Sequence, residues 1–215
     1  MEENREIMVK ICGITTPQEA RAVTEAGADM GGIVVFFPKS KRCLSLERAG
    51  EVLAAFGDGV RKVAVTVSPD EEQIRAINSA GFDFIQIHGP VSEAALQAAE
   101  LPVLKAFNVT DLKELGKYAK NEKIAGYVFD AAEYGSGKTF DWELLKNTER
   151  DGRLFILAGG LTPENVAWAV RTVRPDCVDV SSGVENDSGI GKDEKKIKLF
   201  TAAAKSALSP AAGRQ

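Results

Sequence analysis

Two side chains that can move protons stand where predicted strands end. Cys12 follows the apolar run at residues 7–11, and Asp130 follows the run at residues 127–129. A thiol becomes a base or nucleophile when its pKa falls from the free value of about 8.5, although most free cysteines are small buried hydrophobic residues. A carboxylate behind three apolar residues is costly unless it is solvated, paired or reactive, and partial desolvation would favour it as a proton donor. The pair points to acid–base chemistry, with the structural interpretation of Cys12 still open.

Glycines and serines after the last two predicted strands resemble an anion site. They are Gly159 and Gly160 after residues 154–158, and Ser181, Ser182 and Gly183 after residues 177–180. Bare backbone and hydroxyl groups suit phosphate, which barrel enzymes often bind with the loops after the seventh and eighth strands. Simple turns are the alternative, but two such clusters on adjacent strands favour phosphate.

Three further polar side chains are candidates for the same rim. Arg42 carries a planar fork that suits a substrate carboxylate, whereas a solvated loop arginine is the default. His88, the only histidine, stands at a strand end and either faces the rim or holds a loop. We interpret Lys105 as a rim cation rather than a Schiff-base lysine. A single histidine and no cysteine or carboxylate cluster with ligand spacing predict that there is no metal site.

Eight units of strand then helix must position these residues. Strands are predicted at 7–11, 30–35, 62–67, 84–87, 103–107, 126–129, 154–158 and 177–180, and helices at 17–26, 46–56, 71–80, 93–100, 112–119, 142–146, 163–173 and 194–207. Eight evenly spaced units favour a closed (β/α)8 TIM barrel of parallel strands over a doubly wound sheet, and the Gly-x-Gly-x-x-Gly sequence is absent after the first strand. The barrel should occupy residues 1–208 as one domain, with residues 209–215 as a frayed tail.

Caps and loops refine this outline. Thr16, Asp70, Thr162 and Asp141 are predicted to open helices, and Gly27 and Gly81 to follow helix ends. The loop at residues 134–139 contains Gly-Ser-Gly-Lys-Thr and could close over a ligand, but it lacks the earlier glycine of a nucleotide P-loop.

Strand alternation predicts one buried contact. If Cys12 points inward then Lys10 does too, and Asp179 shares a face with Ser181. Because the first and eighth strands are neighbours in a closed barrel, we expect a buried Lys10–Asp179 ion pair below the pocket floor. Asp179 is also a candidate for ligand contact.

Composition limits the function. The 215 residues carry a net charge of −4, which offers no broad cationic field for nucleic acid. No apolar run reaches the roughly 18 residues of a membrane helix, and the N-terminus lacks the apolar segment of a signal peptide. Three scattered cysteines fit a reducing cytoplasm and suggest structural roles for Cys43 and Cys177. Without an obvious apolar surface patch, a monomer is favoured over a homodimer.

Five motifs occur in order between residues 9 and 200. They are Lys10-Ile11-Cys12-Gly13-Ile14-Thr15, Gln86-Ile87-His88-Gly89, Gly135-Ser136-Gly137-Lys138-Thr139-Phe140-Asp141-Trp142, Ala158-Gly159-Gly160-Leu161 and Val178-Asp179-Val180-Ser181-Ser182-Gly183-Val184-Glu185. As a set they resemble the phosphoribosylanthranilate isomerase family of tryptophan biosynthesis. The sequence departs from the family pattern at Lys41, Thr66, Ser68 and Ser136, and it is short between Asp130 and Gly135.

The resemblance implies an Amadori rearrangement of N-(5-phosphoribosyl)anthranilate to 1-(2-carboxyphenylamino)-1-deoxyribulose 5-phosphate. It implies that Asp130 protonates the furanose ring oxygen, that Cys12 as thiolate removes the C2 proton, and that Arg42 binds the anthranilate carboxylate. No cofactor is implied, because the iminium intermediate is itself the electron sink. The implied substrate-binding residues are Arg42, His88, Gly159, Gly160, Asp179, Ser181, Ser182 and Gly183.

Two alternatives stay open. Another phosphosugar barrel enzyme would share the phosphate site: an indole-glycerol-phosphate synthase would use a lysine acid, and a sugar isomerase with paired aspartates would have aspartate in place of Cys12. A non-catalytic barrel would bind a product analogue tightly without turnover, although the acid–base pair argues against it.

Overall fold

The computed structural model describes residues 6–130, 142–145, 148, 150–189 and 191–208. The loop at 134–139, the predicted cap Asp141 and the tail at 209–215 lie outside these residues. The predictions made for them stay predictions.

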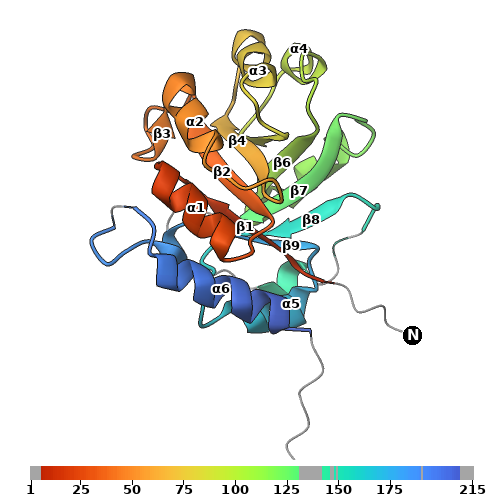
Figure 1. The fold of residues 1–215 in the computed structure, drawn as a ribbon. Helices are drawn as coiled ribbons and strands as arrows, with labels where there is room; N and C mark the ends of the chain where they lie inside the picture. The colour runs from red at the N-terminus through yellow and green to blue at the C-terminus, as the bar shows by residue number, and fades with distance from the viewer. Residues whose placement is uncertain (1–5, 131–141, 146–147, 149, 190, 209–215) are drawn as a thin grey trace, which may run out of the picture.

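Parallel strands close into a barrel, as predicted (Figure 1). Its strands are β1 (Met8–Cys12), β2 (Met30–Val35), β4 (Arg61–Val67), β5 (Phe84–His88), β6 (Val103–Asn108), β7 (Ile124–Asp130), β8 (Leu154–Leu157) and β9 (Cys177–Val180). The sheet runs β1-β9-β8-β7-β6-β5-β4-β2-β3, and a further pairing of β1 with β2 closes the ring. Since all the pairings are parallel, the carboxyl ends of these strands meet at one end of the barrel.

Helices connect and cover the strands (Figure 1). They are α1 (Pro17–Glu25), α2 (Leu46–Leu53), α3 (Glu71–Asn78), α4 (Glu93–Gln97), α5 (Val166–Val173) and α6 (Glu194–Ser206), with the 3-10 helices η1 (Val109–Lys117), η2 (Trp142–Leu145) and η3 (Ser182–Val184). The predicted caps Thr16 and Asp70 are confirmed, and each forms a capping box. Gly27 and Gly81 adopt φ of 71° and 87°, which glycine allows at a helix end.

Some sequence-based boundaries were wrong. The helix predicted from residue 163 begins at Val166, with Asn165 rather than Thr162 at its N-cap position. Residues 163–165 form a turn closed by the bond from Val166 N to Thr162 O at 3.0 Å. The segment predicted as a helix at 112–119 is the 3-10 helix η1, which begins earlier. The two-residue strand β3 (Cys43–Leu44), which pairs only with the end of β2, was not predicted.

The core has two layers. Alternate side chains of the strands fill the barrel interior, and the others pack outward against the helices. The interior set includes Met30, Val63, Val65, Phe84, Leu104, Ala106, Val128, Ile156, Ala158 and Cys177. Burial of Cys177 in this layer confirms its structural role.

Lys105 was assigned wrongly as a rim cation. Its neighbours Leu104 and Ala106 fill the barrel interior, so Lys105 belongs to the outer face together with Phe107. Its ammonium lies buried 4.8 Å from the Phe107 ring centroid and donates to the Ala106 carbonyl at 2.7 Å. It does not line the cavity described below. The strand is apolar on both faces, so its sequence did not show which residues point inward.

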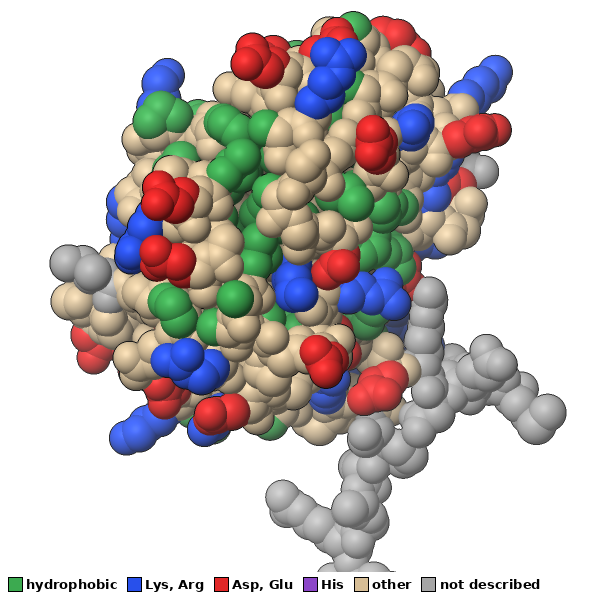
Figure 2. Space-filling model, turned by 45° about the horizontal axis from the view of Figure 1, so that its top comes forward, with side chains coloured by type: hydrophobic (Ala, Val, Ile, Leu, Met, Phe, Trp, Pro, Cys, Tyr) green, Lys and Arg blue, Asp and Glu red, His purple; other side chains and the backbone are tan. Residues whose placement is uncertain are grey.

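The outer surface carries mixed charge. On the face drawn in Figure 2, acidic and basic side chains are interspersed and no field of one sign extends across the molecule. None of the described helices is both long enough and apolar enough to span a membrane.

The predicted Lys10–Asp179 ion pair is confirmed. Lys10 Nζ lies 2.8 Å from Asp179 Oδ2, and the Lys10 side chain is 0% exposed. The pair joins β1 to β9, where Lys10 and Asp179 stand in register. Burial is the largest single influence and disfavours the charge on Lys10, but Asp179 and Cys12 together outweigh it and raise the pKa of Lys10 above its ordinary value.

Replacement of Lys10 by methionine should lower the free energy of unfolding by about 3–5 kcal/mol, because it leaves a buried carboxylate without its cation. Urea unfolding at pH 7 measures this loss. The double variant Lys10→Met/Asp179→Leu is the matched control and should recover much of it, since both charges are gone. An unchanged stability of the single variant would refute the role given to the pair.

Candidate active site

A cavity of about 500 Å³ opens at the carboxyl ends of the barrel strands. Nine of the ten catalytic and substrate-binding residues predicted from the sequence line this cavity: Cys12, Arg42, His88, Asp130, Gly159, Gly160, Asp179, Ser181 and Ser182. These residues come from β1, β5, β7, β9 and the loops between strands and helices, so the closure of the barrel brings them together. Gly183 is the exception and does not line the cavity.

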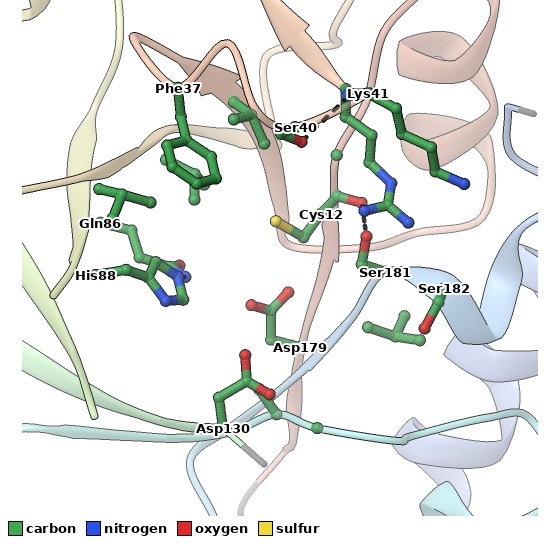
Figure 3. A pocket seen from close by; sticks show the side chains of 18 of the residues that line it. Cys12, Phe37, Ser40, Lys41, Gln86, His88, Asp130, Asp179, Ser181 and Ser182 are labelled. Atoms are coloured by element: carbon green, nitrogen blue, oxygen red, sulfur yellow. Dashed lines mark hydrogen bonds between the residues drawn. The ribbon is translucent and has the colours of Figure 1, made fainter. Parts of the chain in front are cut away.

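The thiol of Cys12 and the carboxylate of Asp130 face the same space. Cys12 ends β1 and Asp130 ends β7, and the strands β9 and β8 lie between them in the ring. Figure 3 shows both side chains directed into the cavity, with the carboxylate of Asp179 between them in this view. An acid and a base from two walls of the barrel can therefore act on one ligand.

Cys12 is not a thiol of lowered pKa. Burial raises the pKa of the Cys12 thiol, and the negative charge of Asp179 adds to this effect. The cations Lys10 and Lys192 act in the opposite direction. The surroundings of Cys12 therefore do not lower its pKa, as the sequence interpretation required for a base.

Two glycine-containing loops form one end of the cavity. Gly159 and Gly160 adopt φ of 85° and 66°, in the region that favours glycine. The side chain of Asn165 ties this loop, since its Oδ1 accepts from Thr162 N at 2.8 Å and its Nδ2 donates to Gly160 O at 2.9 Å. The loop after β8 is thus held open to the cavity by a side chain at the start of α5.

Gly183 lets the second loop approach the first. A Cβ on Gly183 would lie 2.0 Å from the carbonyl oxygen of Leu161. Ser181 is also structural, because its hydroxyl donates to Cys12 O at 3.0 Å (Figure 3) and accepts from Lys192 Nζ at 3.2 Å. Ser182 lines the cavity beside them (Figure 3).

Arg42 is held by an acidic partner. Its Nε donates to Glu185 Oε1 at 2.6 Å, and its Nη2 donates to the same oxygen. Glu185 also accepts from Lys41 Nζ at 3.1 Å and lies 3.8 Å from Lys192 Nζ. Burial alone would raise the pKa of Glu185, but hydrogen bonds from Arg42 and Lys41 hold it below its ordinary value. The carboxylate thus fixes the guanidinium along its Nε edge.

His88 is a neutral rim residue. Its Nε2 lies 2.8 Å from Gln86 Nε2, and both side chains are buried on the cavity side of β5. Burial lowers the pKa of His88 to about 3, with the positive charges of Lys10 and Lys105 adding to the effect.

Four residues that contribute to the site were not singled out from the sequence. Alternate side chains of a strand point to the same face, so the position of Gln86 two residues before His88 on β5 could have identified it. Glu185 stood in a quoted motif but received no role. Lys192 and Asn165 act through contacts set only by the fold, and neither lies in a periodic pattern. In the described part of the chain no group of three or more His, Cys, Asp or Glu residues could hold a metal ion.

The low pKa of His88 predicts a pH-dependent contribution to stability. The unfolded histidine takes up a proton below about pH 6.5, whereas the folded one stays neutral until about pH 3, so stability is lost as the pH falls. Relative to His88→Gln, the wild type should lose about 2 kcal/mol of unfolding free energy between pH 7 and pH 5. Urea unfolding of both proteins at the two pH values tests this. A stability difference that does not change with pH would contradict the assignment.

Comparison with known proteins gives a consistent result. The family model described as N-(5'phosphoribosyl)anthranilate (PRA) isomerase matches residues 9–203. The N-(5'-phosphoribosyl)anthranilate isomerase of Aquifex aeolicus is 40% identical over 204 residues, which cover 93% of this chain and 99% of the relative. The crystal structure of phosphoribosyl anthranilate isomerase from Thermotoga maritima matches with 37% identity and a TM-score of 0.82, covering 93% of this chain and 99% of that one.

A related crystal structure holds a ligand. It is phosphoribosyl anthranilate isomerase in complex with reduced 1-(o-carboxyphenylamino)-1-deoxyribulose 5-phosphate, with 36% identity, a TM-score of 0.80 and coverage of 93% of this chain and 99% of that chain. The motifs, the closed barrel and the full-length similarity agree. The chain belongs to the N-(5'-phosphoribosyl)anthranilate isomerase family.

Proposed function

We propose that this chain carries out the isomerisation of its family, from N-(5'-phosphoribosyl)anthranilate to 1-(2-carboxyphenylamino)-1-deoxyribulose 5-phosphate, with Asp130 as general acid and Cys12 as general base. The observation that carries the residue assignment is the position of these two groups. They line one cavity from β7 and β1, and that cavity also borders the loops after β8 and β9. The reaction is the step of tryptophan biosynthesis that converts an aminoaldose into an aminoketose.

The two groups act in sequence. Asp130 gives its proton to the furanose ring oxygen, the C1–O bond breaks, and the nitrogen lone pair forms the iminium. Cys12 Sγ, as thiolate, then takes the proton from C2, and the C–H electron pair forms the C1–C2 double bond while the iminium nitrogen recovers its lone pair. Tautomerisation of the resulting enolamine gives the ketone. The iminium supplies the electron sink, so the steps need no cofactor.

The remaining cavity residues bind the ends of the substrate. Backbone at Gly159 and Gly160 and the hydroxyl of Ser182 suit the phosphate, since exposed amides and hydroxyls are its usual protein partners. Arg42 faces the anthranilate carboxylate: Glu185 occupies its Nε edge, which leaves its other edge for a second carboxylate.

His88 and Asp179 lie between these two ends and suit contact with the sugar. The hydroxyl of Ser181 is engaged with Cys12 O and Lys192, and Gly183 allows the close approach to Leu161, so both support the loop.

Three broader assignments accompany this function. Residues 1–208 form the catalytic domain, and the protein works as a monomer, because the large apolar side chains exposed in the described residues are only Trp168 and Leu199. The cytoplasm is its compartment, in keeping with three free cysteines. Light scattering on the purified protein tests the monomer, and a mass of two chains would contradict it.

Cys12→Ala and Asp130→Asn should each lower kcat by roughly 10²–10⁴, because each removes a positioned proton-transfer group. KM should change little, since these groups act on the transition state. Steady-state kinetics with freshly prepared substrate measure the effect. Calorimetry with the reduced product analogue should show that both variants still bind it.

Cys43→Ser is the matched control for the thiol. Cys43 does not line the cavity, and a serine still offers an acceptor to Phe37 N, which lies 3.3 Å from the Cys43 sulfur. This variant should keep the wild-type kcat. Full turnover by Cys12→Ala or by Asp130→Asn would remove that residue from its assigned role.

A further inference from the structure

The buried thiol raises a question about the proposed base. Burial favours the neutral form of Cys12, yet removal of a C2 proton requires the thiolate. Something near the sulfur must stabilise its negative charge. The contacts beneath the cavity floor identify that group.

Lys10 lies directly below Cys12 on the same face of β1. Both residues point into the barrel, since they are two positions apart on one strand. A Cβ placed on Gly32 of β2 would lie 3.1 Å from Cys12 Sγ and 3.2 Å from Lys10 Nζ, so the sulfur and the ammonium border the same gap beside that glycine. At this separation the positive charge of Lys10 favours the thiolate, and the thiolate in turn favours the charged form of Lys10.

Asp179 fixes the ammonium in this position. Its Oδ2 lies 2.8 Å from Lys10 Nζ, and Lys10 is 0% exposed, so the lysine cannot swing out to solvent. The ammonium carries three donors and the carboxylate takes at least one of them. A full positive charge is therefore held near the sulfur.

We propose that Lys10 is the positioning residue that stabilises the thiolate of Cys12, and that Asp179 both clamps Lys10 and limits how readily the thiolate forms. The inference rests on the proposed role of Cys12 as base. The thiol loses its proton to solvent, the resulting thiolate is paired with Lys10, and Sγ then accepts the C2 proton of the substrate.

Other charged or titratable groups face Cys12 or the ligand space around it. They are Lys192 below Ser181, Arg42 and Glu185 at the mouth, His88 on β5 and Asp130 on β7. Lys192 also favours the thiolate, but burial lowers its own pKa to about 8, so its charge diminishes as the pH rises. The pKa of Lys10 is raised by Asp179, so Lys10 stays charged over the whole working range. Lys10 is thus the permanent cation at the sulfur.

Replacing the two partners of the ion pair one at a time should change the pKa of Cys12 in opposite directions. Removing the positive charge with Lys10→Met should raise the pKa of Cys12. Removing the negative charge with Asp179→Asn should lower it, because Asp179 repels the thiolate and competes for Lys10. Loss of structure around the cavity would not shift the thiol in two opposite directions.

Alkylation of the full-length enzyme with iodoacetamide from pH 6 to pH 10 measures this shift, with mass spectrometry following the peptide that contains Cys12. Relative to its plateau at high pH, alkylation of Cys12 at pH 7 should be about tenfold slower or more in Lys10→Met, because one pKa unit is a tenfold change in thiolate. In Asp179→Asn, the pH at which Cys12 alkylation reaches half of its plateau rate (the midpoint) should lie below that of the wild type. Cys43, in the same samples, should keep its midpoint.

Lys10→Gln serves as a second neutral variant if Lys10→Met does not fold, and Lys10→Arg should keep the wild-type midpoint. An unchanged Cys12 midpoint in the neutral variants, or a shift in the same direction for Lys10→Met and Asp179→Asn, would overturn the inference. The dependence of kcat/KM on pH tests the role of Lys10 separately from the proposed function. The measured quantity is the pH at which kcat/KM falls on the acidic side of this profile. If the alkylation midpoints move in opposite directions while that pH stays fixed, Lys10 controls the thiol but Cys12 is not the base.

Discussion

One buried ion pair connects the fold of this protein to its chemistry. Lys10 and Asp179 meet 2.8 Å apart inside the barrel, in register on its first and last strands. The contact bridges β1 and β9, which are neighbours in the closed ring of strands. The same ammonium lies beneath Cys12, so the group that stabilises the closed barrel also sets the charge at the cavity floor. A buried charge pair is expensive to desolvate, and a role in the reaction explains its presence better than stability does.

The walls of the cavity follow from barrel closure. Parallel strands place every carboxyl end at one rim, so residues far apart in sequence line a single space of about 500 Å³. Around that space the side chains are prearranged: Glu185 holds Arg42, Asn165 holds the loop at Gly160, and Lys192 holds Ser181. Such fixed groups cost little reorganisation when charge develops in the ligand. The barrel positions Cys12 and Asp130, while these secondary contacts hold Arg42, the loop at Gly160 and Ser181 around the cavity.

Apolar runs and helix-capping residues predicted most of the strands and helices, because both patterns depend only on residues close together in the sequence. The strands at 30–35 and 177–180 matched in both bounds. Strand alternation and the adjacency of the first and eighth strands in a closed barrel together predicted the Lys10–Asp179 pair. What failed depended on distant contacts. Lys105 lies in a strand apolar on both faces, so its direction could not be read. The role of Lys192 depends on a bond to the Ser181 loop, and β3 is too short to show alternation.

The central claim is that Cys12 and Asp130 act on one sugar from two sides of the cavity. A crystal structure of this protein with the reduced product analogue tests it most directly. The account predicts the sulfur of Cys12 within about 3–4 Å of the carbon derived from C2, and the Asp130 carboxylate within hydrogen-bonding distance of the oxygen that leaves the ring. A ligand bound with its sugar carbons away from the thiol, or with Asp130 facing only the phosphate, would contradict it.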